Sequence, residues 1–121
     1  MVRSDCVEIE FDNSKVQALV TDYNKMQKKV GLELTKNIKQ RIDQVKAFDN
    51  FFDVLNYGLG NPHLLEGNKK GLCAINIDKN KRLIIEPIVD DLSAESFKVC
   101  RKIIIKGVED YHGSKTTTYI P

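Results

Sequence analysis

The spacing of the apolar residues changes once along this chain, and that change limits its fold more than any other feature. Between Asn13 and Lys46 apolar residues recur every three or four positions, which is the spacing of amphipathic helices. Beyond Pro62 they alternate with polar residues or form short runs, as strands do. The sequence therefore predicts an α+β protein with helices on one face of a mainly antiparallel sheet.

The first half of the chain predicts one strand and two helices. Residues 6–11 alternate and indicate a strand, after which Asn13 can cap a helix. Gly31 stops or bends this helix, and a second helix follows up to Lys46. Because the connector is so short, we expect an antiparallel helical hairpin. The apolar stripes of the two helices comprise Val16, Leu19, Val20, Tyr23, Met26 and Val30, then Leu34, Ile38, Ile42 and Val45.

The second half predicts a short aromatic helix or turn and then strands. We expect Phe51 and Phe52 to seal one end of the core, although four aromatics between residues 48 and 57 also allow base stacking. Strands are expected at residues 63–66, 72–77 and 82–86, with a long final strand at 97–108 after an acidic loop. We expect a single domain over residues 1–112 and a loose polar tail over residues 113–121.

Length and composition exclude several classes of protein. No apolar run approaches the roughly 18 residues of a membrane span, and the first residues lack the apolar stretch of a signal peptide, so we expect a cytoplasmic protein. The three cysteines are far apart and odd in number, which argues against a disulfide framework and favours buried thiols. No Cys/His cluster has the spacing of a metal site, and we expect neither metal nor cofactor.

The positive charge of the chain is concentrated in the helical segment. Between Lys15 and Lys46, eight Lys and Arg residues stand against three Asp and Glu residues, a local excess of five positive charges. Such a surface can bind the phosphates of RNA or DNA, and its candidate contacts are Lys36, Lys39 and Arg41. The alternative is an ordinary solvated helix face.

The chain has two histidines, and both lie at the edges of expected strands. His63 opens a strand, and His112 follows the last one in the run Asp110-Tyr111-His112. This tripeptide places three proton-exchanging groups at the end of a strand. Catalysis and a surface or packing role are both open for histidines placed in this way.

Three segments of the chain resemble, in the same order, the motifs of one protein family. Residues 62–71 (Pro-His-Leu-Leu-Glu-Gly-Asn-Lys-Lys-Gly) resemble its pattern His-x-Leu-Lys-Gly-Asp-Arg-x-Gly. Residues 80–87 (Asn-Lys-Arg-Leu-Ile-Ile-Glu-Pro) resemble its strand Asn-Tyr-Arg-Leu-Ile-Phe-Glu-Pro, and residues 110–112 match its closing Asp-Tyr-His. The similarity runs in one order over nearly the whole chain, and the family it resembles is that of the HigB-type killer proteins of the RelE/ParE toxin superfamily.

The resemblance implies a RelE/ParE-like fold and the toxin of a type II toxin–antitoxin system, an mRNA interferase that cleaves translated mRNA on the ribosome. In such cleavage the ribose 2′-OH attacks the adjacent phosphate. The reaction needs a base, an acid and either a cation or hydrogen-bond donors for the charged phosphorane, but no metal. A HigA-type antitoxin with a helix-turn-helix domain is the implied partner.

The family roles fall on specific residues of this chain. His63 and His112 become the acid and base candidates, without an assignment of which is which. Asp110 would orient or tune a histidine, and Tyr111 would contact the substrate. The implied phosphate contacts are Lys69, Lys70 and Arg82.

The sequence departs from the family pattern at several positions, which keeps two other functions open. Glu66 stands where the family has Lys, and Lys69 and Lys70 lack the planar two-pronged grip of Arg on phosphate. Lys81 replaces an aromatic residue. The alternatives are a ParE-like gyrase poison, which needs no catalytic histidine, and a non-catalytic module that binds nucleic acid or a protein.

Overall fold

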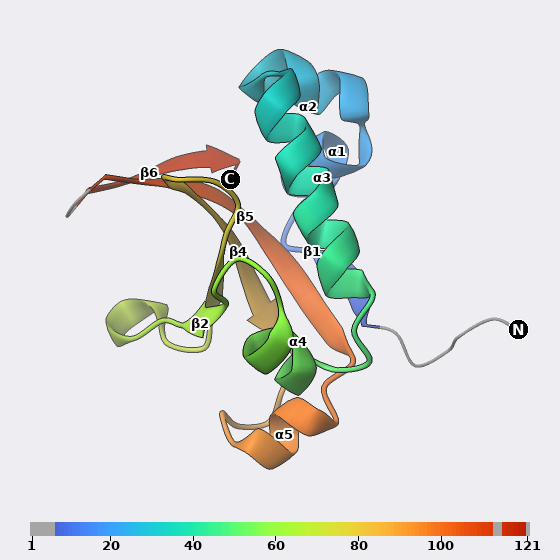
Figure 1. Cartoon of the computed structure of the whole chain (residues 1–121), viewed down its shortest axis with the longest axis vertical. Helices are drawn as coiled ribbons and strands as arrows, with labels where there is room; N and C mark the ends of the chain where they lie inside the picture. The colour runs from blue at the N-terminus through green and yellow to red at the C-terminus, as the bar shows by residue number, and fades with distance from the viewer. Residues whose placement is uncertain (1–6, 113–114, 121) are drawn as a thin grey trace, which may run out of the picture.

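The computed structural model of the chain describes residues 7–112 and 115–120, and for residues 111–112 and 115–119 it describes the backbone alone. Helices α1–α3 cover one face of a twisted sheet, while α4 and α5 lie at one end of it (Figure 1). The elements are β1 Glu8–Phe11, α1 Ser14–Thr21, α2 Tyr23–Val30, α3 Leu32–Lys46, α4 Phe51–Tyr57, β2 His63–Leu64, the 3-10 helix η1 Gly67–Lys69, β3 Cys73–Asn76, β4 Lys81–Pro87, α5 Ala94–Lys98, β5 Lys102–His112 and β6 Lys115–Ile120.

The expected helical hairpin is confirmed, with one break that the sequence did not reveal. Asn13 caps α1 through its side chain, which accepts a hydrogen bond from the Val16 amide, and Gly31 ends α2. The first helix divides at Asp22, whose carboxylate caps α2 by accepting from the Lys25 amide. The apolar stripe continues across this break, so periodicity alone could not locate it. None of the helices in the described residues has both the length and the apolarity of a membrane span.

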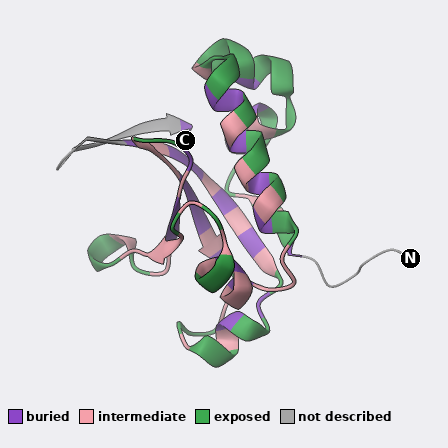
Figure 2. Ribbon diagram, viewed as in Figure 1, coloured by how far each residue is buried: buried purple, intermediate pink, exposed green. Residues whose placement is uncertain are grey.

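The sheet has the strand order β1-β5-β4-β3-β2, and β6 also pairs with β5. Only the β1–β5 pair is parallel among the described pairs, so the expected mainly antiparallel sheet is confirmed. Alternate residues of the central strands, such as Ile75, Leu83 and Ile105, join the helices in one hydrophobic core. Figure 2 shows this core as buried residues between α3 and the sheet. The residues between them point to the opposite face of the sheet.

The last strand begins later than the sequence predicts. Residues 97–108 read as one strand because their apolar residues are continuous, but Phe97 belongs to α5, and β5 begins at Lys102. The Ser93 side chain caps α5 by accepting from the Ser96 amide. Phe97 then packs edge-to-face on the fully buried Phe51, with ring centroids 4.9 Å apart. Phe51 thus seals one end of the core as expected, and Phe52 packs against it while partly exposed.

The expectation of a loose tail beyond residue 112 was also wrong. Residues Lys115–Ile120 form β6, which pairs antiparallel with β5 from His112 back to Val108. Ile120 is buried in the core with 1% of its surface exposed. Threonines make this segment look polar, but threonine also favours strands, and Ile120 near its end reaches the core.

The two described cysteines, Cys73 in β3 and Cys100 before β5, are buried free thiols, and Cys6 lies outside the described residues. Burial raises the pKa of the Cys73 thiol to about 12, against a smaller lowering effect of a hydrogen bond from the His63 backbone. At pH 8 only about one molecule in 10⁴ then carries the reactive thiolate. We expect a thiol reagent such as DTNB to modify Cys73 only after unfolding, and stoichiometric reaction of Cys73 in the native protein would contradict this assignment.

Candidate active site

The face of the sheet opposite the helices, here called the outer face, carries three of the expected site residues, namely His63, Lys69 and Arg82. Its orientation follows from the pairing register, because residues directly opposite each other on neighbouring strands point to the same side. Asn76 of β3, Arg82 of β4 and Glu109 of β5 stand opposite one another in one row. Their sequence neighbours Ile75, Leu83 and Val108 lie in the core, so this row points outward.

His63 lies on the same outer face. It pairs with Ala74 of β3, which is two residues from Asn76 and on the same side. Neighbouring strands lie about 4.8 Å apart and residues rise about 3.3 Å, which separates the Cα atoms of His63 and Arg82 by about 12 Å. Two side chains that start from one face at this separation can reach the same phosphodiester group.

The conformation of the preceding loop selects the tautomer that a neutral His63 ring adopts. Its Nδ1 lies 2.9 Å from the carbonyl oxygen of Asn61. A carbonyl oxygen only accepts, so Nδ1 must carry the proton of this contact, and in the neutral ring Nε2 then holds the lone pair. A neutral imidazole held in this tautomer can accept a proton at Nε2.

The loop that holds His63 needs glycine at one position. Gly60 has a φ of +84°, and a Cβ at this position would lie 2.4 Å from the carbonyl oxygen of Asn76. This close approach lets the Gly60 carbonyl accept a hydrogen bond from the Asn76 amide at 2.7 Å. The loop is thereby attached to β3, and His63 follows three residues later at a fixed place.

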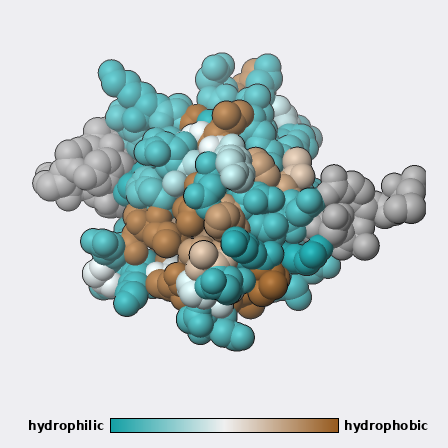
Figure 3. Space-filling model, turned by 60° about the horizontal axis from the view of Figure 1, so that its bottom comes forward, coloured by the Kyte–Doolittle hydropathy of each residue, from teal (hydrophilic) through white to brown (hydrophobic). Residues whose placement is uncertain are grey.

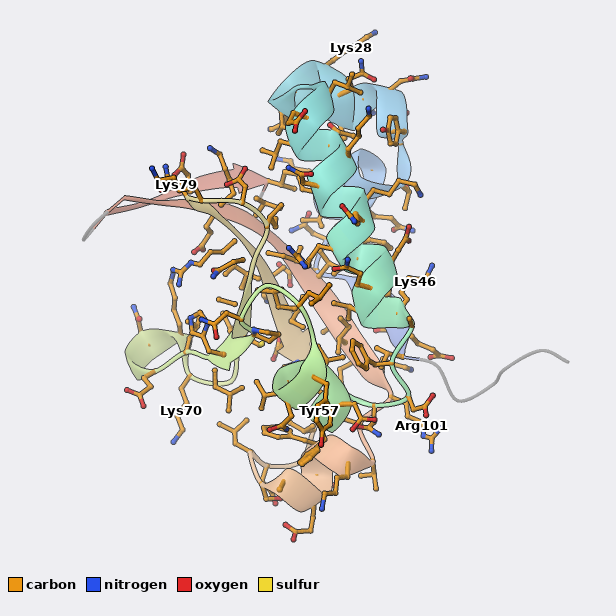
Figure 4. The ribbon with its side chains drawn as sticks, in the orientation of Figure 1. Lys28, Lys46, Tyr57, Lys70, Lys79 and Arg101 are labelled. Carbon is orange, nitrogen blue, oxygen red and sulfur yellow. The ribbon has the colours of Figure 1, made fainter. Side chains whose placement is uncertain are left out.

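Lys69 reaches across the outer face to β5. Its ammonium group lies 3.1 Å and 3.4 Å from the two carboxylate oxygens of Glu109, which attaches η1 to the row that contains Arg82. Lys70, the other lysine of the turn, is exposed and points away from the sheet (Figure 4). The sequence did not reveal Glu109 and Asn76 as neighbours of Arg82 on the outer face, because their position in this row depends on strand register, which no local pattern shows.

Asp110 is not on the outer face with His63. It follows Glu109 on β5, so it points to the helix side, where its carboxylate lies 3.6 Å from the Lys81 ammonium group. Only 6% of its surface is exposed. The structure therefore does not bring Asp110 together with His63, and the expectation that Asp110 orients or tunes a histidine stays a prediction. The backbone of Tyr111 and His112 completes β5, but the side chains of these two residues lie outside the described part.

The basic residues of α3 lie on a different surface and do not act as one group. Lys36 and Lys39 line an open groove of about 570 Å³ on the exposed side of α3. Arg41 donates from its Nη1 to the side chain of Gln44 on the same helix. Its guanidinium packs against Gly60, in the loop before β2. Because α3 covers the core side of the sheet, Lys36 and Lys39 face away from the row that contains Arg82.

Exposed apolar side chains occur at the end of the molecule formed by α4 and α5. Figure 3 brings this end forward and shows hydrophobic surface divided by hydrophilic side chains. Divided apolar surface of this kind is normal in globular proteins, so it does not compete with the outer face as a functional site. Within the described residues no group of three His, Cys, Asp or Glu side chains is arranged to hold a metal ion.

The chain is similar to known proteins in its fold. No family model matches the sequence, and no curated protein matches it. Among solved structures, the YoeB/ParE toxin from Agrobacterium tumefaciens is 15% identical, with 88% of this chain and 99% of that chain covered at a TM-score of 0.55. The YoeB–YefM complex and the YoeB dimer, both from Staphylococcus aureus, are 20% and 17% identical, with 88% of this chain and 97% of those chains covered at TM-scores of 0.49 and 0.48. The chain thus has the fold of YoeB/ParE toxins, which confirms the expected architecture.

Proposed function

We propose that this chain is the toxin of a type II toxin–antitoxin system and that it cleaves translated mRNA as an endoribonuclease. The observation that carries the proposal is the pair His63 and Arg82 on one sheet face, with the Nε2 lone pair of His63 available. The fold supports membership of the toxin superfamily. The more specific HigB-type assignment rests on the three sequence segments that resemble that family.

In the proposed reaction the ribose 2′-OH attacks the adjacent phosphorus and the bond to the 5′ oxygen breaks. His63 Nε2 accepts the 2′ proton, because its Nδ1 proton is already donated to Asn61. The products are a 2′,3′-cyclic phosphate and a 5′-hydroxyl end, and the leaving oxygen must receive a proton. We assign that acid to His112, with Tyr111 as a substrate contact, from the sequence resemblance.

Arg82 is placed to stabilise the negative charge that builds up on the phosphorane. Its planar guanidinium can donate two parallel hydrogen bonds to phosphate oxygens, whereas lysine offers a single charged point. We expect Arg82→Lys to lower kcat/KM about tenfold with little change in stability, because the charge is kept and the fork is lost. Cleavage rates on ribosome-bound mRNA measure this, and an unchanged rate would remove Arg82 from the reaction.

The other candidate residues take supporting roles. Lys69 adds positive charge beside Arg82, although Glu109 balances part of it. Lys70 and Arg41 are weaker candidates for RNA contact, because Lys70 points away from the sheet and Arg41 packs against Gly60. Asp110 does not share a face with His63, so its role toward a histidine is inferred from the sequence resemblance alone. Lys36 and Lys39 would contact the phosphates of ribosomal RNA.

An antitoxin is the proposed partner, because a toxin that cleaves its host's mRNA must be restrained until it is needed. The cytoplasm is the proposed location, because the proposed substrate is translated there. The HigA type, with a helix-turn-helix domain, follows from the sequence resemblance. Co-purification of the chain with the product of a small neighbouring gene would support this partnership.

Two assays on the purified chain distinguish the proposed function from the alternatives. We expect it to stop protein synthesis in a reconstituted translation reaction and to leave DNA supercoiling by gyrase unchanged. Loss of supercoiling with normal translation would instead identify a gyrase poison. Binding to RNA that weakens with salt but generates no new ends would identify a non-catalytic module.

A further inference from the structure

The contact between Arg41 and Gly60 joins helix α3 to the loop that holds His63. Arg41 lies within α3, and the loop of residues 58–62 leads into β2. A Cβ built on Gly60 would lie 3.1 Å from Cζ of Arg41, so the guanidinium covers this glycine directly. Gly60 is also bound to β3, because its carbonyl accepts a hydrogen bond from the Asn76 amide at 2.7 Å. The loop is therefore held both by a side chain of α3 and by the backbone of the sheet.

The guanidinium of Arg41 occupies this place at a cost in hydrogen bonding. Its Nη1 donates to the side chain of Gln44 at 2.8 Å. Its Nε is buried and has no hydrogen-bond partner among the described residues. A buried donor without a partner destabilises a fold, and a half-buried arginine could avoid this cost by turning its head group to water. The position over Gly60 is thus a local compromise of the kind that occurs beside functional sites.

A second local cost lies at the next residue of the loop. Asn61 has a φ of +52°, and it is the one residue other than glycine with a positive φ in the described part of the chain. Asparagine tolerates this left-handed region better than most residues, but the surrounding structure must still maintain it. In this conformation the Asn61 carbonyl oxygen lies 2.9 Å from Nδ1 of His63. The direction of that carbonyl therefore depends on how firmly the loop is held at Gly60.

We propose that Arg41 is a positioning residue for His63. By covering Gly60 it holds Asn61 in its left-handed conformation, and the Asn61 carbonyl then keeps the proton of the neutral ring on Nδ1. Arg41 acts through the loop and does not touch the RNA. The inference rests on the proposed function, because the reaction needs the lone pair of His63 at Nε2.

The geometry favours this role over a direct contact between Arg41 and phosphate. Arginine grips phosphate through two neighbouring donors of its planar head group. Here Nη1 already donates to Gln44, and Nε is buried. Each of the two donor pairs of the guanidinium thus has one member that is engaged or out of reach. A phosphate contact would act mainly through RNA affinity and hence KM, whereas a positioning residue acts through the rate of the chemical step.

The test observes the His63 ring directly, in the full chain without RNA. In the nitrogen NMR spectrum of the isotope-labelled protein, protonated and unprotonated ring nitrogens have widely separated chemical shifts. The spectrum is recorded at the alkaline end of a pH titration, where the ring is neutral, so it identifies the nitrogen that carries the proton. The spectrum of His63→Ala assigns the signals, because the chain has two histidines. We expect the proton of wild-type His63 on Nδ1.

Arg41→Ala should change this spectrum and the cleavage rate together. Without the guanidinium over Gly60 the loop is released, and the ring should show a mixture of its two tautomers. We expect kcat on ribosome-bound mRNA to fall about tenfold with little change in KM, because a misplaced base weakens the transition state. Arg41→Lys should behave like Arg41→Ala, since the strongly hydrated ammonium group leaves this covered place for water.

A matched control removes the same charge elsewhere on the helix. Lys46→Ala changes the exposed last residue of α3 and should keep the wild-type ring spectrum and kcat. Alanine favours helices and Arg41 is half-buried, so the Arg41→Ala protein should fold. If it does not, Arg41→Gln replaces it, because the shorter glutamine side chain ends before Gly60 and should give the same mixture of tautomers.

A proton that stays on Nδ1 alone in the Arg41 variants would overturn the inference, whatever their cleavage rates. A wild-type ring with its proton on Nε2 would also overturn it. So would an activity that Arg41→Ala loses through KM and Arg41→Lys restores, because that pattern belongs to a phosphate contact. The ring spectrum does not depend on RNA cleavage. Mixed tautomers in the Arg41 variants of a protein that fails to stop translation would therefore reject only the proposed function.

Discussion

His63→Ala is expected to slow cleavage of ribosome-bound mRNA by about 10²–10⁴-fold, the usual contribution of a general base. The reason is specific to this site: Nδ1 is occupied by the Asn61 carbonyl, and Nε2 is the nitrogen left to accept the 2′ proton. The loss should appear in kcat more than in KM, because His63 acts in the transition state. Single-turnover cleavage of end-labelled mRNA on stalled ribosomes measures it.

A control variant separates this effect from unfolding. Glu95→Gln changes an exposed residue of α5, outside the outer-face row, and should cleave at the wild-type rate. Both variants should unfold at temperatures close to that of the wild type, because His63 is only half-buried. A His63→Ala protein that is folded and fully active would show that another group accepts the proton.

Phe51→Ala is expected to cause the largest loss of stability, about 3–5 kcal/mol of the free energy of unfolding. Phe51 has no exposed surface, belongs to the core and makes the edge-to-face contact with Phe97. Its removal leaves a cavity where α4, α5 and the sheet meet, and the change approaches the total stability of many single domains. Urea denaturation monitored by circular dichroism gives the value.

The adjacent residue provides the control for this prediction. Phe52 is partly exposed, and the Lys98 ammonium group lies 5.0 Å from the centre of its ring. Its replacement by alanine should cost on the order of 1 kcal/mol, because it removes little buried surface and one weak cation–π contact. Equal losses for the two variants would mean that the core does not extend to Phe51 as described.

Much of the fold could be predicted because the helical stripes and the alternating strands are long enough to be unambiguous. The errors occurred where short-range signals conflict with tertiary pairing. Phe97 adjoins an apolar run and looks like part of a strand, although Ser93 caps a helix there. The threonine-rich end looks like a loose tail until β5 is present to pair with it.

The candidate site was only partly predictable, for a different reason. His63 and Arg82 could be selected as residue types within recognisable segments, and the sheet brings them to one face. The separation of Asp110 from His63 depends on the one-residue alternation of β5, which reverses the face of each successive side chain. The contact between Lys69 and Glu109 joins residues forty positions apart and follows from the three-dimensional arrangement alone.

The proposed function requires that the outer face of this sheet cleaves mRNA during translation. Primer extension on a message in a reconstituted translation reaction tests it most directly, with parallel reactions that lack ribosomes or contain the His63→Ala protein. We predict new 5′ ends inside the reading frame that require both ribosomes and His63. A message that stays intact with the wild-type protein, or is cut equally by His63→Ala, would contradict this account.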